Sequence, residues 1–231
     1  MQLDRHLSIL PRSLLVSGYF IGVIEVLNVR EEYQPVFGYS FDGDRYLNIT
    51  NRCTLHCEHC PKFSGNWMVR GHNLHLLREP TVSEIIDAVG NPSAWHEVVF
   101  SGYGEPTLRL YDVLEVARRI HEMGGRVRLE TDGLANVFFG RDITPDLEGN
   151  IDTLTVALVA HDSSVYDQLC HPKVSRAYDA VIEFIKRARD FVPQVIITAV
   201  NDVADVDLLA CARIAQELRV GFEPRSIRQY C

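Results

Sequence analysis

The chain has 231 residues, which is enough for one domain with a full hydrophobic core. Apolar residues make up 46% of it and charged residues 23%, as in ordinary soluble globular proteins. The net charge of −8 argues against nucleic acid as a partner, because nucleic-acid-binding surfaces use Lys and Arg to neutralise phosphates. The one stretch that suggests a membrane segment, residues 14–27, carries Glu25 and is too short to cross a bilayer.

Residues 1–44 are predicted to form an N-terminal β extension. Within it, residues 19–29 are rich in Ile and Val and predict a strand, and residues 33–39 predict its partner. The extension has no small-residue cleavage site, so it does not have the pattern of a signal peptide. No function for this extension follows from its residues.

From residue 45 onward, strand patterns alternate with helix patterns. Strands are predicted at residues 45–50, 97–101, 126–130, 153–159, 194–200 and 220–226. Helices are predicted at residues 81–89, 110–123, 163–170, 175–191 and 206–218. This alternation favours parallel strands joined by right-handed helical crossovers. The predicted fold is therefore α/β, with a partial (β/α)6 TIM-like barrel over residues 45–231 that follows the N-terminal β extension.

Three of the six cysteines follow the first predicted strand with the spacing C-x3-C-x2-C: Cys53, Cys57 and Cys60. Thiolates suit iron–sulfur clusters or zinc. Most cubane clusters take four cysteines, so a set of three leaves one iron open to a small molecule. Zinc remains an alternative, with His56 or His59 completing the ligand set of a zinc-stabilised binding module. An iron–sulfur site requires a reducing compartment, which predicts a cytoplasmic protein.

The other three cysteines are scattered along the chain. Cys211 lies among apolar residues of a predicted helix and is expected in the core, and Cys231 is the last residue. A second cluster would require these two cysteines to meet Cys170. Their spacing does not indicate this, so we expect no second cluster.

Polar residues and glycines recur directly after the predicted strands. They are Gly102, Gly104 and Glu105 after the second strand, Thr131 and Asp132 after the third, and His161 and Asp162 after the fourth. The carboxyl ends of parallel strands meet at one edge of a sheet, so we expect these residues to lie near the three cysteines. A functional site is therefore predicted at this edge.

Each of these groups has a functional interpretation and a structural one. The glycines allow close backbone approach to a ligand, and Glu105 can accept hydrogen bonds from an ammonium group. Asp132 can bind ribose hydroxyls, although Asp-Gly is also a common turn signal. His161 is a candidate ligand contact, whereas Asp162 has the pattern of a helix N-cap.

The cysteine spacing and the Gly104-Glu105 pair together resemble the radical S-adenosylmethionine (SAM) superfamily. The resemblance implies a [4Fe–4S] cluster on Cys53, Cys57 and Cys60, whose open iron binds SAM. It also implies that SAM is contacted by His59, Gly102, Gly104, Glu105, Thr131, Asp132 and His161. The superfamily usually has an aromatic residue before the last cysteine. His59 takes that place here and can stack in the same way.

The strings YLNITNRCTLHCEHCPK, GYGEPTLR, ETDGLAN and GRDITPDLEG resemble the radical SAM proteins associated with TatD-family hydrolases, over residues 45–226. This implies reductive cleavage of SAM to a 5′-deoxyadenosyl radical that abstracts hydrogen from a small substrate. The implied partners are an electron donor such as flavodoxin or ferredoxin and a TatD-like hydrolase. Two enzyme alternatives remain: one resembling 7-carboxy-7-deazaguanine synthase, and an activase that abstracts hydrogen from a glycine of a partner protein.

Overall fold

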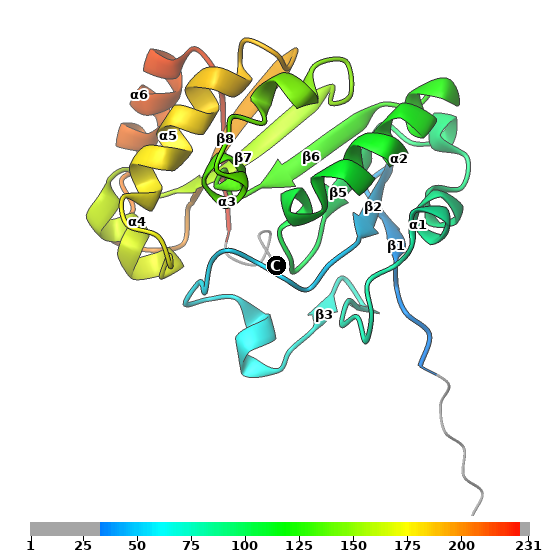
Figure 1. Cartoon of the computed structure of the whole chain (residues 1–231). Helices are drawn as coiled ribbons and strands as arrows, with labels where there is room; N and C mark the ends of the chain where they lie inside the picture. Colours follow the sequence, from blue (N-terminus) through cyan, green and yellow to red (C-terminus); the bar gives the residue numbers. More distant parts are fainter. Residues whose placement is uncertain (1–32, 227–231) are drawn as a thin grey trace, which may run out of the picture. The chain divides into compact units, whose positions relative to one another are not determined.

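A seven-stranded sheet forms the centre of the computed structural model, which describes residues 33–226 (Figure 1). Its strands, in sheet order, are β1 (Gly38–Phe41), β2 (Asp44–Asn48), β5 (Val98–Ser101), β6 (Val127–Thr131), β7 (Thr153–Val159), β8 (Gln194–Val200) and β9 (Gly221–Arg225). β1 runs antiparallel to β2, and every later neighbouring pair is parallel. Parallel neighbours bring the carboxyl ends of β2 and β5–β9 to the same edge.

Helices lie between consecutive parallel strands and cover one face of the sheet (Figure 1). They are α1 (Val82–Val89), α2 (Leu110–Glu122), α3 (Ala135–Phe139), α4 (Ser163–Cys170), α5 (Ala177–Ala188) and α6 (Leu208–Leu218). Short 3₁₀ turns occur at Pro61–Ser64, Pro92–Ala94, Pro106–Arg109 and Thr144–Leu147. No helix within residues 33–226 is long and apolar enough to cross a bilayer. Residues 14–27 lie outside the described residues.

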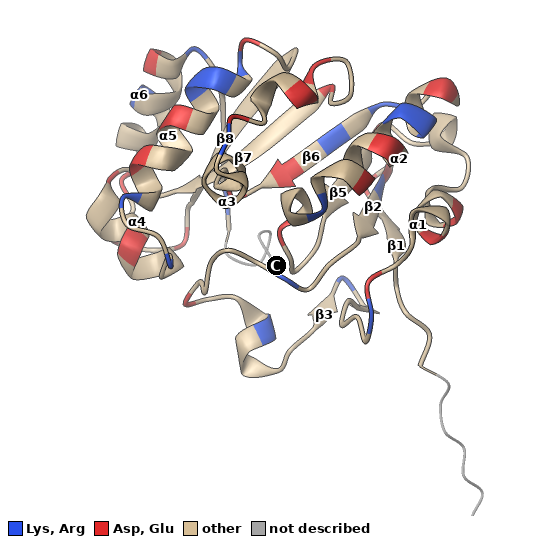
Figure 2. Cartoon of the chain, in the orientation of Figure 1, with Lys and Arg blue, Asp and Glu red and all other residues tan. Residues whose placement is uncertain are grey.

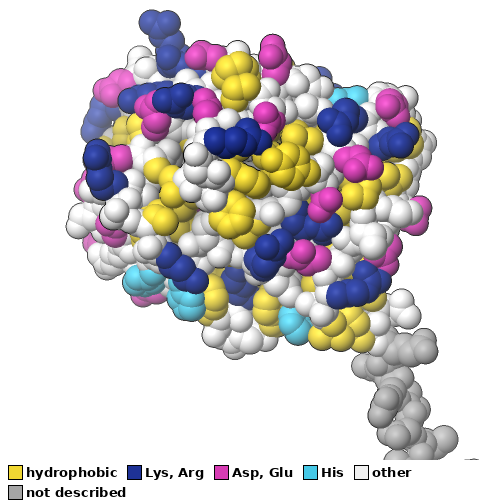
Figure 3. Space-filling view, in the orientation of Figure 1, with side chains coloured by type: hydrophobic (Ala, Val, Ile, Leu, Met, Phe, Trp, Pro, Cys, Tyr) yellow, Lys and Arg dark blue, Asp and Glu magenta, His cyan; other side chains and the backbone are white. Residues whose placement is uncertain are grey.

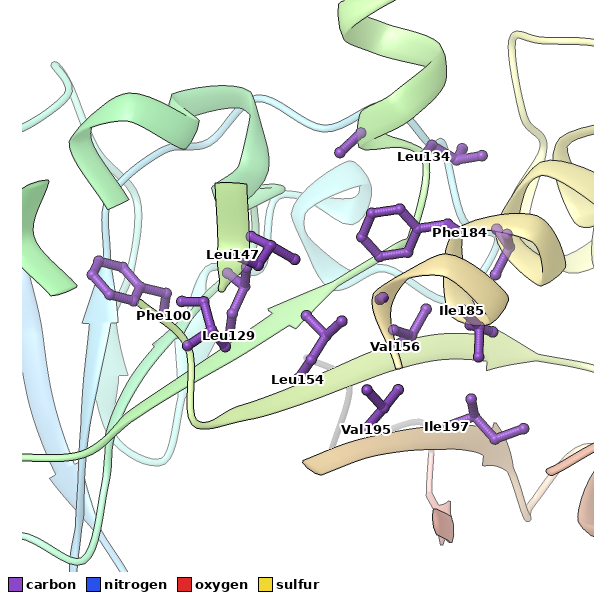
Figure 4. Close-up of a cluster of buried hydrophobic side chains, with 14 of the residues drawn as sticks. Phe100, Leu129, Leu134, Leu147, Leu154, Val156, Phe184, Ile185, Val195 and Ile197 are labelled. Atoms are coloured by element: carbon purple, nitrogen blue, oxygen red, sulfur yellow. The ribbon is translucent and has the colours of Figure 1, made fainter. Parts of the chain in front are cut away.

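The hydrophobic core lies between the sheet and these helices (Figure 4). Phe100 of β5, Leu129 of β6 and Ile197 of β8 are fully buried. Phe184 and Ile185 of α5 pack into the same cluster. Side chains alternate between the two faces of a strand, so these apolar positions explain why the helices dock on this face.

The opposite face of the sheet carries charged and polar side chains. Arg128 pairs with Asp44 at 2.5 Å and with Glu97 at 2.7 Å, between their side-chain nitrogen and oxygen atoms. The Thr153 hydroxyl donates to Glu97 at 2.7 Å. Strand alternation therefore gives the sheet one apolar face under the helices and one polar face.

The predicted α/β fold with a mostly parallel sheet is confirmed. Each of the six strands predicted from residue 45 onward overlaps an observed strand, from β2 through β9. Residues 33–39 were expected to pair with residues 19–29, whereas the observed strand β1 overlaps this range only at Gly38 and Tyr39 and pairs with β2. Residues 19–29, the other half of the predicted extension, lie outside the described residues.

A two-stranded hairpin, β3 (Met68–Val69) and β4 (His72–Asn73), lies between the strand predicted at residues 45–50 and the helix predicted at residues 81–89, where no strand was predicted. Its turn is Arg70-Gly71, with φ of 51° and 85°. A two-residue hairpin turn of type I′ has positive φ at both central residues, and Arg-Gly is a weak sequence signal for this geometry. The hairpin forms because Val69 and the following Leu74 are buried in a small apolar cluster with Tyr39 and Tyr103, a tertiary effect.

Candidate functional site

A cavity lies at the carboxyl edge of the sheet, beside the loop of residues 51–60 that we call the cysteine loop. Its lining includes Cys53, Cys57, His59, Cys60, Gly102, Gly104, Glu105, Thr131 and Asp132. These are all of the site residues predicted from the sequence except His161. Strands β2, β5 and β6 bring them together because their carboxyl ends are adjacent.

The cysteine loop is held by backbone hydrogen bonds from two sides. The Glu105 amide donates to the Arg52 carbonyl at 2.7 Å, which joins the loop to the turn after β5. The His56 amide donates to the Cys170 carbonyl at 3.1 Å, and the Glu58 amide donates to the Leu169 carbonyl at 2.9 Å. The end of α4 therefore anchors the loop on both sides of Cys57.

Gly104 is required by close packing against the chain itself. A Cβ atom at this position would lie 2.7 Å from the Arg52 carbonyl oxygen and even closer to that of Thr50. Gly102 has φ of +111°, and its Cβ would lie 2.7 Å from Asn48 Oδ1. The sequence suggested that these glycines allow a ligand to approach closely, whereas their tightest contacts are with the chain from Asn48 to Arg52.

We expect Gly104→Ala to destabilise the protein by about 1–3 kcal/mol, the usual range for overpacking, because backbone carbonyls rather than flexible side chains block the added methyl. Denaturant unfolding measures this change. Gly149→Ala is the control, since its Cβ would meet nothing within 4 Å and only the backbone strain of φ +69° remains. An unchanged unfolding midpoint for Gly104→Ala would contradict this account of the turn.

Glu105 connects the turns that follow β5 and β6. Its side chain is 3% exposed. Oε1 accepts hydrogen bonds from the Thr107 amide at 2.9 Å, the Thr107 hydroxyl at 2.6 Å and the Thr131 hydroxyl at 2.8 Å. Oε2 accepts from the Asp132 amide at 2.7 Å. The carboxyl group is therefore fixed in position before any ligand binds.

Two buried carboxyl groups lie next to each other at this point. Burial, with repulsion from Asp132, raises the pKa of Glu105 to about 8. Burial also raises the pKa of Asp132, although hydrogen bonds from the Thr54 hydroxyl and the Leu134 amide act in the opposite direction. A cation bound beside the pair stabilises both ionised forms, so the site favours an ammonium group.

The three thiols line the cavity without meeting at one point. Among residues 33–226, no three His, Cys, Asp or Glu side chains converge in the way that a single metal ion requires. A tetrahedral zinc site needs that convergence. A cubane cluster instead binds each cysteine through a different iron, so its thiolates surround a space. Burial raises the pKa of Cys53 to about 12, so metal binding there must release a proton.

Thr155 supports the presence of a ligand in the cavity. Its side chain lines the cavity and is 3% exposed, and its hydroxyl has no hydrogen-bond partner among the described residues. Buried polar groups are normally paired, so this hydroxyl indicates a polar ligand atom. With three thiols, two carboxyl groups and this hydroxyl, the donor set fits an iron–sulfur cluster together with a small cationic molecule.

His161 does not line the cavity. Its Nδ1 accepts a hydrogen bond from the Asp207 amide at 3.1 Å, and its Nε2 lies 3.2 Å from Asp162 Oδ2. It therefore joins the loops after β7 and β8, and the predicted ligand contact gains no support from this geometry. Asp162 accepts from the Val165 amide at 2.9 Å, which confirms the predicted N-cap of α4.

Thr155 and Cys170 are among the residues of the cavity wall that sequence reasoning missed. Thr155 lies in a predicted strand, and strand alternation could have placed it on the polar face. Cys170 ends α4 and lies 110 positions beyond Cys60, so no spacing rule connects it to the other cysteines. Only the tertiary fold brings Cys170 to the cysteine loop.

A second cavity, of about 640 Å³, lies along the polar face of the sheet and shares Ser101, Gly102, Glu130 and Arg225 with the first. At this junction, Glu130 accepts from the Ser101 hydroxyl at 2.7 Å and from the Arg225 guanidinium at 3.0 Å. Side chains of both charges line the rest of it, including Asp44, Glu97, Arg128 and Glu223. The two cavities therefore meet at a partly buried ion pair.

Comparisons with known proteins agree with this geometry. A family model described as the radical SAM superfamily matches residues 47–214. A search of curated proteins found no match.

Several solved structures share the fold. The structure of TYW1 with a lysine-pyruvate adduct bound has a TM-score of 0.55 and 16% identity, covering 80% of this chain and 64% of that chain. Streptococcus suis SuiB bound to the precursor peptide SuiA has a TM-score of 0.57 and 15% identity, and the match covers 81% of this chain and 40% of that chain. Methylornithine synthase (PylB) has a TM-score of 0.53 and 15% identity, and the match covers 80% of this chain and 53% of that chain. The chain thus spans 40–64% of these structures, and at such identities the likeness concerns the fold alone.

Proposed function

The chain belongs to the radical SAM superfamily of enzymes, and from this premise we propose that it binds a [4Fe–4S] cluster and SAM and acts on a small molecule. One observation carries the proposal. Cys53, Cys57 and Cys60 line the same cavity as the buried Glu105 and Asp132 carboxyl groups. Three thiols beside an anionic pocket suit a cluster whose remaining iron binds a cationic amino acid derivative.

The chain's residues have distinct tasks in this proposal. Cys53, Cys57 and Cys60 hold the cluster, and Glu105 with Asp132 holds the ammonium group of SAM. When bound, the reduced cluster and SAM would supply a 5′-deoxyadenosyl radical that can abstract hydrogen from the substrate. The Thr155 hydroxyl offers SAM one further polar contact. Apolar residues such as Leu55 and Leu169 line the same cavity and exclude water from it.

The second cavity supports a small polar substrate. Its volume of about 640 Å³ falls in the range of small-molecule sites. Its mixed charges suit a substrate that carries polar groups of both signs, and its junction with the first cavity gives the substrate access to SAM. Direct assays with candidate substrates separate this proposal from the 7-carboxy-7-deazaguanine synthase-like alternative. Co-purification of a large partner protein would instead favour the glycine activase.

The finer assignment is to the TatD-associated radical SAM proteins, with a partial (β/α)6 barrel. Its support is the set of strings named above and the alternation of strands and helices over residues 45–226. It implies a TatD-like hydrolase and a flavodoxin or ferredoxin as partners in the cytoplasm. Lys and Arg alternate with Asp and Glu along the helices (Figure 2) and on the surface seen from the same side (Figure 3), which supports a small substrate over nucleic acid.

Metal analysis tests the proposal and separates it from the zinc-stabilised module. Protein purified and reconstituted without oxygen is expected to hold about four iron and four sulfide per chain. One zinc per chain, with neither iron nor sulfide, would contradict the proposal.

A further inference from the structure

A fourth cysteine, Cys170, lies in the wall of the proposed cluster cavity. It is the last residue of α4 and is fully buried. The carbonyls of Leu169 and Cys170 accept hydrogen bonds from Glu58 and His56, the residues on either side of Cys57. The backbone amides on either side of Cys57 therefore hold it next to the end of α4.

The side chains of Cys170 and Cys57 also contact each other, through a hydrogen bond between the two sulfur groups. Both side chains line the same cavity, and Cys170 is fully buried. A thiolate that binds a cluster has no S–H group, so in this pair only Cys170 can be the donor.

We propose that Cys170 donates an S–H···S hydrogen bond to the Cys57 thiolate of the bound cluster and thereby raises the reduction potential of the cluster. The inference rests on the proposed function. Hydrogen bonds to cluster sulfurs favour the reduced cluster, which carries more negative charge. Cys170 is thus a positioning and tuning residue that acts through Cys57.

The test measures the midpoint potential of the cluster by redox titration followed by electron paramagnetic resonance. Cys170→Ala removes the donor and is expected to lower the equilibrium constant of reduction by on the order of tenfold. For a one-electron step, this makes the midpoint potential ~59 mV more negative. Cys170→Ser keeps a donor in a similar volume and is expected to stay near the wild-type potential. Cys211→Ala is the control, because Cys211 is equally buried but lies on α6 outside the cavity lining.

The inference is overturned by an unshifted potential in Cys170→Ala with its cluster intact, or by an equal shift in Cys170→Ser. Cys170→Val repeats the test with an apolar side chain that fills the space left empty in Cys170→Ala. Loss of the cluster from both apolar variants but not from Cys170→Ser supports the hydrogen bond, whereas its loss from all three indicates a packing role and overturns it. A wild-type protein that holds no cluster overturns the proposed function and this inference together.

Discussion

Cys57→Ala is expected to abolish cluster binding and, with it, all cleavage of SAM. Cys57 is the middle member of the thiol set and is the one fixed from both sides by α4. Two thiols and an alanine cannot hold a cubane that already lacks a fourth protein ligand. Iron content and the absorbance of the reconstituted protein measure the loss, and 5′-deoxyadenosine formation should fall to background.

The matched control is Cys211→Ala, which removes a buried thiol away from the cavity. It should keep the full iron content even where its stability falls, since a lost thiol in the core leaves a cavity. A Cys57→Ala variant that retains both its iron and its SAM cleavage would show that the cluster ligands have been misassigned.

Glu105→Ala is expected to leave the cluster in place and raise the dissociation constant for SAM by on the order of 10- to 100-fold, the loss of one hydrogen bond to a charged group. The carboxyl group faces the cavity beside Asp132 and is already held by Thr107 and Thr131. Equilibrium binding of SAM to the reconstituted protein measures the change. Glu122→Ala, an exposed position on α2, is the control.

The same carboxyl group predicts a pH dependence. Burial and Asp132 raise the pKa of Glu105 to about 8, so the group gains its charge as the pH rises through that value. Affinity for a cationic ammonium group should therefore increase between pH 7 and 8.5. In Glu105→Gln, most of this dependence of the affinity on pH should disappear. A dissociation constant unchanged by either substitution would remove Glu105 from the SAM site.

The parts of this structure that were predictable depend on local pattern. Alternating strand and helix segments fixed the parallel sheet, and its geometry alone predicted that residues after separate strands would share one edge. Cys53, Cys57 and Glu105 were found in this way, because each directly follows or closely trails a strand and their chemistry is distinctive.

The parts that were missed depend on tertiary contact. The β3–β4 hairpin forms around Val69 packed on Tyr39 and Tyr103, residues that are distant in sequence. Cys170 reaches the cysteine loop only because α4 ends there. His161 follows a strand as predicted, but its ring accepts a hydrogen bond from the loop after β8. The position of a residue after a strand does not predict this contact.

The most direct test of the central claim is to incubate the anaerobically reconstituted protein with SAM and a one-electron reductant and to quantify 5′-deoxyadenosine. The proposed site predicts that this nucleoside forms in the wild type and is absent from Cys57→Ala. A wild-type protein that carries an intact, reducible cluster yet neither binds SAM nor releases 5′-deoxyadenosine would contradict it.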